Sequence, residues 1–209
     1  MYIAIEGVIG VGKTTLARLL QPTFNAEILL EIFEENPFLS DFYGDRERYA
    51  FQTQMFFLLS RYHQQRRSVP EFLAKNENLL SDYTFAKDSL FARINLAGDE
   101  LDMYGRVHEA LAEKIQHPNL LVFLRAKTKT LMERIEMRDR PYERDMDSAY
   151  IAALAETYSD FFSKPYNNTP VLTIDTDDLD FVRNEKDLAF IKKKIEEALT
   201  KAPLQPDLI

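Results

Sequence analysis

The stretch that decides the fold lies near the start of the chain and reads Gly7-Val8-Ile9-Gly10-Val11-Gly12-Lys13-Thr14. It fits the pattern G-x-x-x-x-G-K-[ST], whose glycines let the backbone curl until successive N–H groups point at one anion. Residues 2–6, before it, form an apolar run typical of a buried strand, and residues 13–20 have the pattern of a helix. A strand, this loop and a helix in succession predict a phosphate-binding loop with its anion at the helix N-terminus.

The side chains that end the loop suit a nucleoside triphosphate. We expect Lys13 to reach the β- and γ-phosphates, and the Thr14 hydroxyl to ligate Mg²⁺. The expected ATP-binding segment is residues 7–15, from Gly7 to Thr15. The loop alone does not separate a kinase from an ATPase or a GTPase.

The composition of the chain excludes several kinds of partner and of metal site. The chain has 209 residues, enough for one domain with a full core, together with a formal net charge of −8 and no cysteine. An acidic surface repels a phosphate backbone, so no nucleic-acid polymer is expected as a partner. The lack of cysteine excludes disulfides and thiolate metal sites. Because the apolar runs are too short to cross a bilayer, we expect a cytoplasmic protein with no membrane partner.

Apolar runs alternate with helical patterns along the rest of the chain. Further strands are predicted at residues 27–32, 78–81, 120–124 and 171–174. Helices are predicted at residues 46–67, 85–95, 99–115, 128–138, 148–162 and 185–199, with a loop at residues 139–145. This alternation predicts an α/β fold with a five-stranded parallel sheet flanked by helices. Residues 1–201 form one domain in this prediction, and residues 202–209 form a C-terminal tail.

Two carboxylates follow predicted strands at the end where ligands bind to parallel sheets. Glu31 closes the second strand and Asp82 follows the third. A phosphoryl-transfer enzyme needs one carboxylate to orient or deprotonate the accepting hydroxyl, and an acid near Mg²⁺. We assign Glu31 to the first role and Asp82 to the second. The alternative for Glu31 is an acidic turn that it shares with Glu34 and Glu35.

Three arginines gather near the loop at residues 139–145. Arg134 and Arg138 are four residues apart on one predicted helix, and Arg140 follows at the end of that helix. Guanidinium groups bind phosphate oxygens well and stabilise a phosphoryl-transfer transition state. They predict a lid that closes over the phosphates and excludes water. The alternative is a solvated helix face, balanced by acids such as Glu136.

The long helix predicted at residues 46–67 carries two polar groups within its apolar stripe. Gln54 and Arg61 are seven residues apart, so they share a helix face with an offset of about 20°, and Leu58 lies between them. An apolar surface interrupted by a few polar groups is what a pocket for a base requires. The alternative is that both side chains lie in solvent at the edge of the helix.

Taken in order and at their spacing, these segments resemble the deoxynucleoside kinases of the deoxycytidine, deoxyguanosine and deoxyadenosine kinase group, bacterial type. The resemblance runs from Ile3 to about Thr176. Besides the phosphate loop it rests on Glu31-Ile32-Phe33 with Asn36-Pro37-Phe38-Leu39 and Phe42-Tyr43, on Glu47-Arg48-Tyr49-Ala50-Phe51 leading to Gln54 and Arg61, on Arg134-Ile135-Glu136-Met137-Arg138-Asp139-Arg140, and on Val171-Leu172-Thr173-Ile174-Asp175. It implies a P-loop kinase fold with an Arg-rich lid.

The resemblance also implies individual roles. Glu31 matches the general base for the sugar 5′-hydroxyl, and Gln54 matches the glutamine that pairs with the base edge. The remaining matches are Tyr43 and Glu143 near the 3′-hydroxyl, Arg61 and Asp88 as a pair near the base, Asp82 as the acid near magnesium, Arg134, Arg138 and Arg140 on the donor phosphates, and Asp175 at the start of the adenine loop.

One triplet departs from the family pattern. Relatives usually have an acid, an arginine and a serine where this chain has Asp82-Tyr83-Thr84. The arginine is replaced by Tyr83, which removes a fixed cation. Lys87 lies four residues further on, one helical turn away, and we hypothesise that it restores the missing charge near the acceptor. The alternative is an ordinary solvent-exposed lysine.

The sequence therefore favours ATP- and Mg²⁺-dependent phosphorylation of a deoxynucleoside 5′-hydroxyl to the 5′-monophosphate in nucleotide salvage. A purine is the preferred substrate, chiefly deoxyadenosine, and a deoxycytidine or broad-specificity kinase is the alternative. More distant alternatives are a thymidylate-kinase-like enzyme, which needs cations for a phosphorylated acceptor, and a nucleotide-dependent switch, which would carry an N-K-x-D motif. A homodimer is expected from the family.

Overall fold

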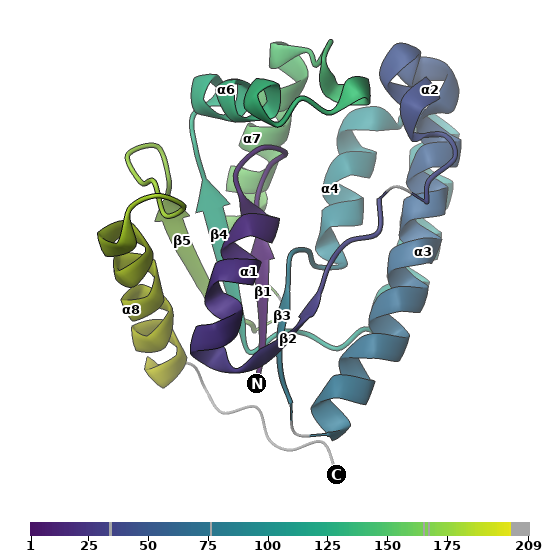
Figure 1. Ribbon diagram of the computed structural model, residues 1–209. Helices are drawn as coiled ribbons and strands as arrows, with labels where there is room; N and C mark the ends of the chain where they lie inside the picture. Colours follow the sequence, from purple (N-terminus) through teal and green to yellow (C-terminus); the bar gives the residue numbers. More distant parts are fainter. Residues whose placement is uncertain (34, 76, 165, 167, 202–209) are drawn as a thin grey trace.

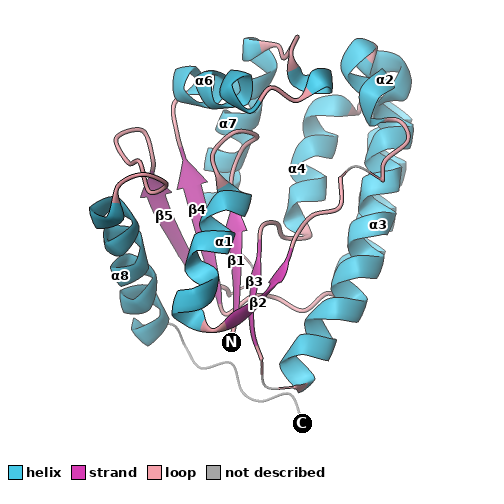
Figure 2. Cartoon of the chain, in the orientation of Figure 1, coloured by secondary structure: helices cyan, strands magenta, loops and turns pink. Residues whose placement is uncertain are grey.

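The computed structural model describes residues 1–33, 35–75, 77–164, 166 and 168–201, so the predicted tail at 202–209 lies outside the described residues. Five strands form one sheet: β1 (Tyr2–Glu6), β2 (Ala26–Leu29), β3 (Asn78–Ser81), β4 (Leu120–Arg125) and β5 (Val171–Asp175). They pair in parallel in the order β2-β3-β1-β4-β5, so their carboxyl ends share one edge (Figure 2). The predicted α/β fold with five parallel strands is confirmed.

The helices are α1 (Lys13–Phe24), α2 (Leu39–Gly44), α3 (Arg46–Ala74), α4 (Ala86–Asn95), α5 (Gly98–Ala112), α6 (Thr128–Arg138), the 3₁₀ helix η1 (Pro141–Glu143), α7 (Ser148–Phe162) and α8 (Glu185–Lys201). Helices α1 and α8 lie on one face of the sheet, and α4 and α7 lie on the other with α3 beside α4 (Figure 1). Helices α2 and α6 lie beyond the carboxyl ends of the strands. Among the described residues, no helix is both long enough and apolar enough to cross a membrane.

The sheet is covered on both faces, which explains the composition of its strands. Ile3 in β1, Leu80 in β3 and Val122 in β4 are fully buried. Parallel strands with helices on both sides have no solvated face, so their sequences read as continuous apolar runs rather than alternating ones. Two buried polar residues interrupt these runs at strand ends: Glu6 in β1 and Ser81 in β3.

Most predicted elements agree with the structure, and the helices at Thr128–Arg138 and Ser148–Phe162 match residue for residue. The second strand was predicted too long: β2 ends at Leu29, so Glu31 follows the strand instead of closing it. The reason is that the backbone N–H of Glu31 donates to a carboxylate oxygen of Asp82, 2.8 Å away, and not to a neighbouring strand.

Two helical segments were not predicted. Helix α3 continues past residue 67 to Ala74 in spite of Pro70, because Val69 packs against the core. The short helix α2 falls in a segment that the periodicity did not resolve. The predicted loop at residues 139–145 contains the single turn of η1.

Candidate active site

The loop between β1 and α1 has a backbone that only glycine adopts readily. Gly7 has φ 146° and Gly12 has φ 101°, both in the region that disfavours side chains. A Cβ on Gly7 would clash with the carbonyl oxygen of Leu124, and one on Gly12 would lie 2.9 Å from the ring of Phe181. The two glycines that frame the motif are thus required by both conformation and packing, as a loop wrapped around an anion demands.

Lys13 lies at the start of α1, against the phosphate loop. The Lys13 ammonium donates to the backbone oxygens of Gly7 (2.7 Å) and Val8 (3.1 Å), so it folds back over the loop. Burial, followed by the neighbouring cation Lys87, lowers the pKa of Lys13 to about 8. Bound phosphate would favour its charged form.

The residues predicted to hold the metal also meet. The hydroxyl of Thr14 donates to a carboxylate oxygen of Asp82. Among the described residues there is no cluster of three acidic, histidine or cysteine side chains that could hold a metal ion. One hydroxyl and one carboxylate are nevertheless a donor set that suits Mg²⁺ arriving with nucleotide phosphates, because Mg²⁺ keeps waters and needs few protein oxygens.

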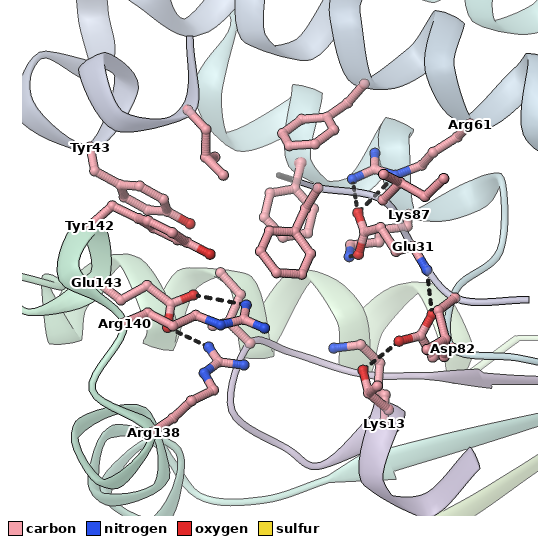
Figure 3. A pocket seen from close by; sticks show the side chains of 18 of the residues that line it. Lys13, Glu31, Tyr43, Arg61, Asp82, Lys87, Arg138, Arg140, Tyr142 and Glu143 are labelled. Carbon is pink, nitrogen blue, oxygen red and sulfur yellow. Dashed lines mark hydrogen bonds and ion pairs between the residues drawn. The ribbon is translucent and has the colours of Figure 1, made fainter. Parts of the chain in front are cut away.

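A cavity of about 360 Å³ opens beside the loop, at the carboxyl ends of the strands. Figure 3 shows Glu31, Arg61, Lys87, Asp82 and Lys13 on one side of it, and Tyr43, Tyr142, Glu143, Arg138 and Arg140 on the other. The predicted site residues that line the cavity are Ile9, Lys13, Thr14, Glu31, Tyr43, Gln54, Arg61, Asp82, Lys87, Arg138, Arg140 and Glu143. Asp88 lies behind Arg61 and is fully buried.

Glu31 is surrounded by cations. One of its carboxylate oxygens accepts from the Nε of Arg61 at 3.0 Å, and the other pairs with Lys87. Burial would raise the pKa of Glu31, but Arg61 and Lys87 outweigh it and hold that pKa well below its usual range. Glu31 is therefore an ionised acceptor, and the hypothesis that Lys87 is a solvent lysine is wrong, since its side chain is 8% exposed.

Helix α3 contributes a buried polar side chain, Gln54, to the cavity wall. Gln54 is 2% exposed, and its Oε1 has no hydrogen-bond partner among the described residues. Phe57 lies nearby on the cavity wall, with the Arg61 guanidinium 4.4 Å from the centre of its ring. The expectation that Gln54 and Arg61 share the pocket face of one helix is confirmed by their positions on the cavity wall.

The lid closes against the opposite wall. Arg138 pairs with Glu143, and an Arg140 nitrogen lies 3.7 Å from the same carboxylate. Tyr142 of the lid stacks on Tyr43 of α2 with ring centres 5.9 Å apart. The lid is thus in contact with the side of the cavity assigned to the sugar.

Arg134 and Asp175 do not join this group. Arg134 donates to the backbone oxygen of Thr176 at 2.7 Å and to its hydroxyl at 3.0 Å, so it lies beside the loop after β5. Asp175 pairs with Arg125 at the surface. Arg134 also donates to the backbone oxygen of Val11 in the phosphate loop at 3.4 Å, so it lies between that loop and the loop after β5, whereas Arg138 and Arg140 lie on the cavity wall. The contact of all three arginines with nucleotide stays a prediction, as does that of the exposed Thr15.

Among the residues near the site that were not predicted are Glu6 and Tyr142. Glu6 is fully buried and accepts from the backbone N–H (2.6 Å) and hydroxyl (2.7 Å) of Thr84. Its burial raises its pKa. A single acid in an otherwise apolar strand was the signal for Glu6, whereas nothing in the sequence pattern marked Tyr142.

Comparison with known proteins agrees with this geometry. The family model described as "Deoxynucleoside kinase" matches residues 3–200. The chain is 36% identical over 201 residues to the deoxyguanosine kinase of Bacillus subtilis (strain 168), covering 95% of this chain and 97% of that one. It is 32% identical over 200 residues to the deoxyadenosine kinase of Dictyostelium discoideum, covering 93% and 79%.

A solved structure of deoxyadenosine kinase from M. mycoides with bound dATP superimposes with a TM-score of 0.81 at 26% identity, covering 94% of this chain and 99% of that one. The fold is therefore that of the P-loop kinases. The alternative of a nucleotide-dependent switch has no support in these matches. Because the family model matches nearly the whole chain and the deoxyguanosine kinase relative is covered almost completely at 36% identity, the chain belongs to the deoxynucleoside kinase family and is a deoxynucleoside kinase.

Proposed function

We propose that this kinase transfers the γ-phosphoryl group of ATP to the 5′-hydroxyl of a purine deoxynucleoside, chiefly deoxyadenosine, in nucleotide salvage. The observation that carries the proposal is the meeting of Lys13, Glu31 and Asp82 at one end of a cavity that has Gln54 on its wall. The cavity provides a place for phosphates, for an accepting hydroxyl and for a base within one enclosure.

The preference for adenine rests on the unpaired acceptor. Oε1 of Gln54 is buried with no donor among the described residues, and the 6-amino group of adenine supplies one. The carbonyl oxygen of guanine does not, so deoxyguanosine would need the amide turned over. The names of the relatives, deoxyguanosine kinase and deoxyadenosine kinase, support a purine but do not rank the two.

In this mechanism Glu31 accepts a hydrogen bond from the 5′-hydroxyl and directs its oxygen at the γ-phosphorus. Because the transition state of phosphoryl transfer is loose, the proton leaves late and orientation matters more than basicity. A carboxylate kept ionised by Arg61 and Lys87 suits that task. Lys13 neutralises charge on the transferring group.

The lid arginines and the metal complete the site. Arg138 and Arg140 would exchange Glu143 for phosphate oxygens, which frees that carboxylate for the sugar 3′-hydroxyl next to Tyr43. Thr14 and Asp82 would hold Mg²⁺, which would supply positive charge to neutralise the phosphates of the nucleotide. The homodimer expected from the family stays a prediction.

A panel of substrates tests the base preference. The four deoxynucleosides and adenosine are ranked by kcat/KM with saturating MgATP. We expect deoxyadenosine first and deoxyguanosine second. A best substrate of deoxycytidine or thymidine would overturn the purine proposal, and a lack of turnover with every nucleoside would overturn the assignment of the cavity.

The role of Lys87 can be tested separately. Lys87→Met removes a cation beside Glu31 and the acceptor hydroxyl, and we expect kcat to fall by about 10- to 100-fold with little change in KM for ATP. Lys87→Arg keeps the charge and should retain most activity. The matched control is Lys129→Met, at an exposed position of α6. Wild-type turnover in Lys87→Met would mean that the lysine does not replace the missing arginine.

A further inference from the structure

The peptide bond that leads into Glu31 is held at both ends by side chains. Its carbonyl oxygen, that of Leu30, accepts from the Nε2 of Gln64 at 2.9 Å. Its N–H, that of Glu31, donates to Asp82 at 2.8 Å. Because β2 ends at Leu29, no strand pairing fixes this peptide, and these two bonds take the place of a sheet ladder.

The orientation of Gln64 is set in turn by Tyr83. The Tyr83 hydroxyl donates to Oε1 of Gln64. An amide has one acceptor end and one donor end, so once Oε1 faces Tyr83 the Nε2 group is left to face Leu30. Without the hydroxyl, the bond to Leu30 alone would hold the amide in this orientation.

Tyr83 is itself firmly held. It is fully buried, in a small core cluster with Tyr2, Val69 and Leu79. Since Tyr83 directly follows Asp82, both ends of the Leu30–Glu31 peptide are tied to consecutive residues after β3.

We propose that Tyr83 and Gln64 are positioning residues that fix the backbone of Glu31 and thereby the direction of its carboxylate. The inference rests on the proposed role of Glu31. Arg61 and Lys87 both attract the carboxylate. Its distance from a bound 5′-hydroxyl therefore depends on the position of the Glu31 Cα, which the peptide before it fixes. A displacement of about 1 Å in such a group can lower a rate by about 10²-fold.

The first test is Tyr83→Phe, which removes one hydroxyl and leaves the ring. We expect kcat to fall by about 10-fold, with the KM values for ATP and nucleoside changed less than about twofold. Gln64→Leu should do the same, and the double variant should be no slower than the slower single variant, because both changes break one chain of hydrogen bonds. The matched control is Tyr62→Phe, which should keep wild-type turnover because the Tyr62 hydroxyl accepts from Arg66, at 2.9 Å, and not from a residue that holds the Glu31 peptide.

The second test repeats Tyr83→Phe in a Glu31→Gln background, measured by single turnover at high enzyme concentration. If Tyr83 acts through Glu31, the added substitution lowers the residual rate no further. An equal loss in both backgrounds would mean a general structural effect, and wild-type turnover of Tyr83→Phe itself would overturn the inference while leaving Glu31 in place. Wild-type turnover of Glu31→Gln alone would instead overturn the proposed function.

Discussion

Replacing Glu31 with glutamine lowers kcat by about 10³-fold, with KM for ATP nearly unchanged. Glutamine has the same shape but no charge, so it accepts a weaker hydrogen bond from the 5′-hydroxyl and no longer balances Arg61 and Lys87. In the proposed function, ATP binds to the phosphate loop and the lid, which the substitution does not touch. Steady-state kinetics with deoxyadenosine, varied against ATP and against nucleoside, measure both effects.

Glu35→Gln is the matched control for this experiment. Glu35 lies four residues further on and is exposed, so it should keep full activity. The comparison also tests the acidic-turn alternative, in which the two acids are equivalent members of one surface turn. Equal activities of the two variants would favour that alternative over a role for Glu31 in catalysis.

The parts of the site that depend on local chemistry could be predicted from the sequence. The phosphate loop is fixed by where glycine is required, and Gly7 and Gly12 have the positive φ values that the motif implies. Asp82 could be placed because every parallel strand ends at the same edge of the sheet. Both arguments need only a few neighbouring residues and the topology.

Predictions that depend on distant partners were less successful. Arg134 and Arg138 share a helix face by spacing, yet Arg134 binds Thr176, which is 42 residues away in the sequence. Periodicity describes where a side chain leaves a helix, but it cannot describe which loop meets it. The hydrogen bonds by which Gln64 and Tyr83 hold the peptide before Glu31 could not be predicted for the same reason, because they join residues from three separate segments of the chain.

Arg61→Met should lower the free energy of unfolding by about 3–5 kcal/mol at pH 8. Arg61 lies between Glu31 and Asp88, and its side chain is 6% exposed while that of Asp88 is fully buried. Glu31 keeps Lys87 as a partner when the guanidinium is removed, but Asp88 loses the one cation with which it forms an ion pair among the described residues. Urea denaturation compares the variant with Arg66→Met, a control on the same helix whose guanidinium donates to the Tyr62 hydroxyl and forms no ion pair among the described residues.

Removing Asp88 as well should recover part of this loss. In Arg61→Met/Asp88→Leu no uncompensated carboxylate remains behind the pocket, so we expect the double variant to be more stable than Arg61→Met alone.

Low pH should also reduce the loss of stability in Arg61→Met, because it protonates Asp88. Burial raises the pKa of Asp88 to about 6, from an ordinary value of 3.8, even with Arg61 beside it. Protonation therefore favours the folded state, and this contribution is lost as the pH rises through the folded pKa. Loss of Arg61 raises that pKa further, so the deficit of Arg61→Met should be smaller at pH 5.5 than at pH 8, and the double variant should show less of this difference. A double variant that is less stable than Arg61→Met, with a deficit independent of pH, would mean that packing of the arginine and not its charge holds this side of the pocket together.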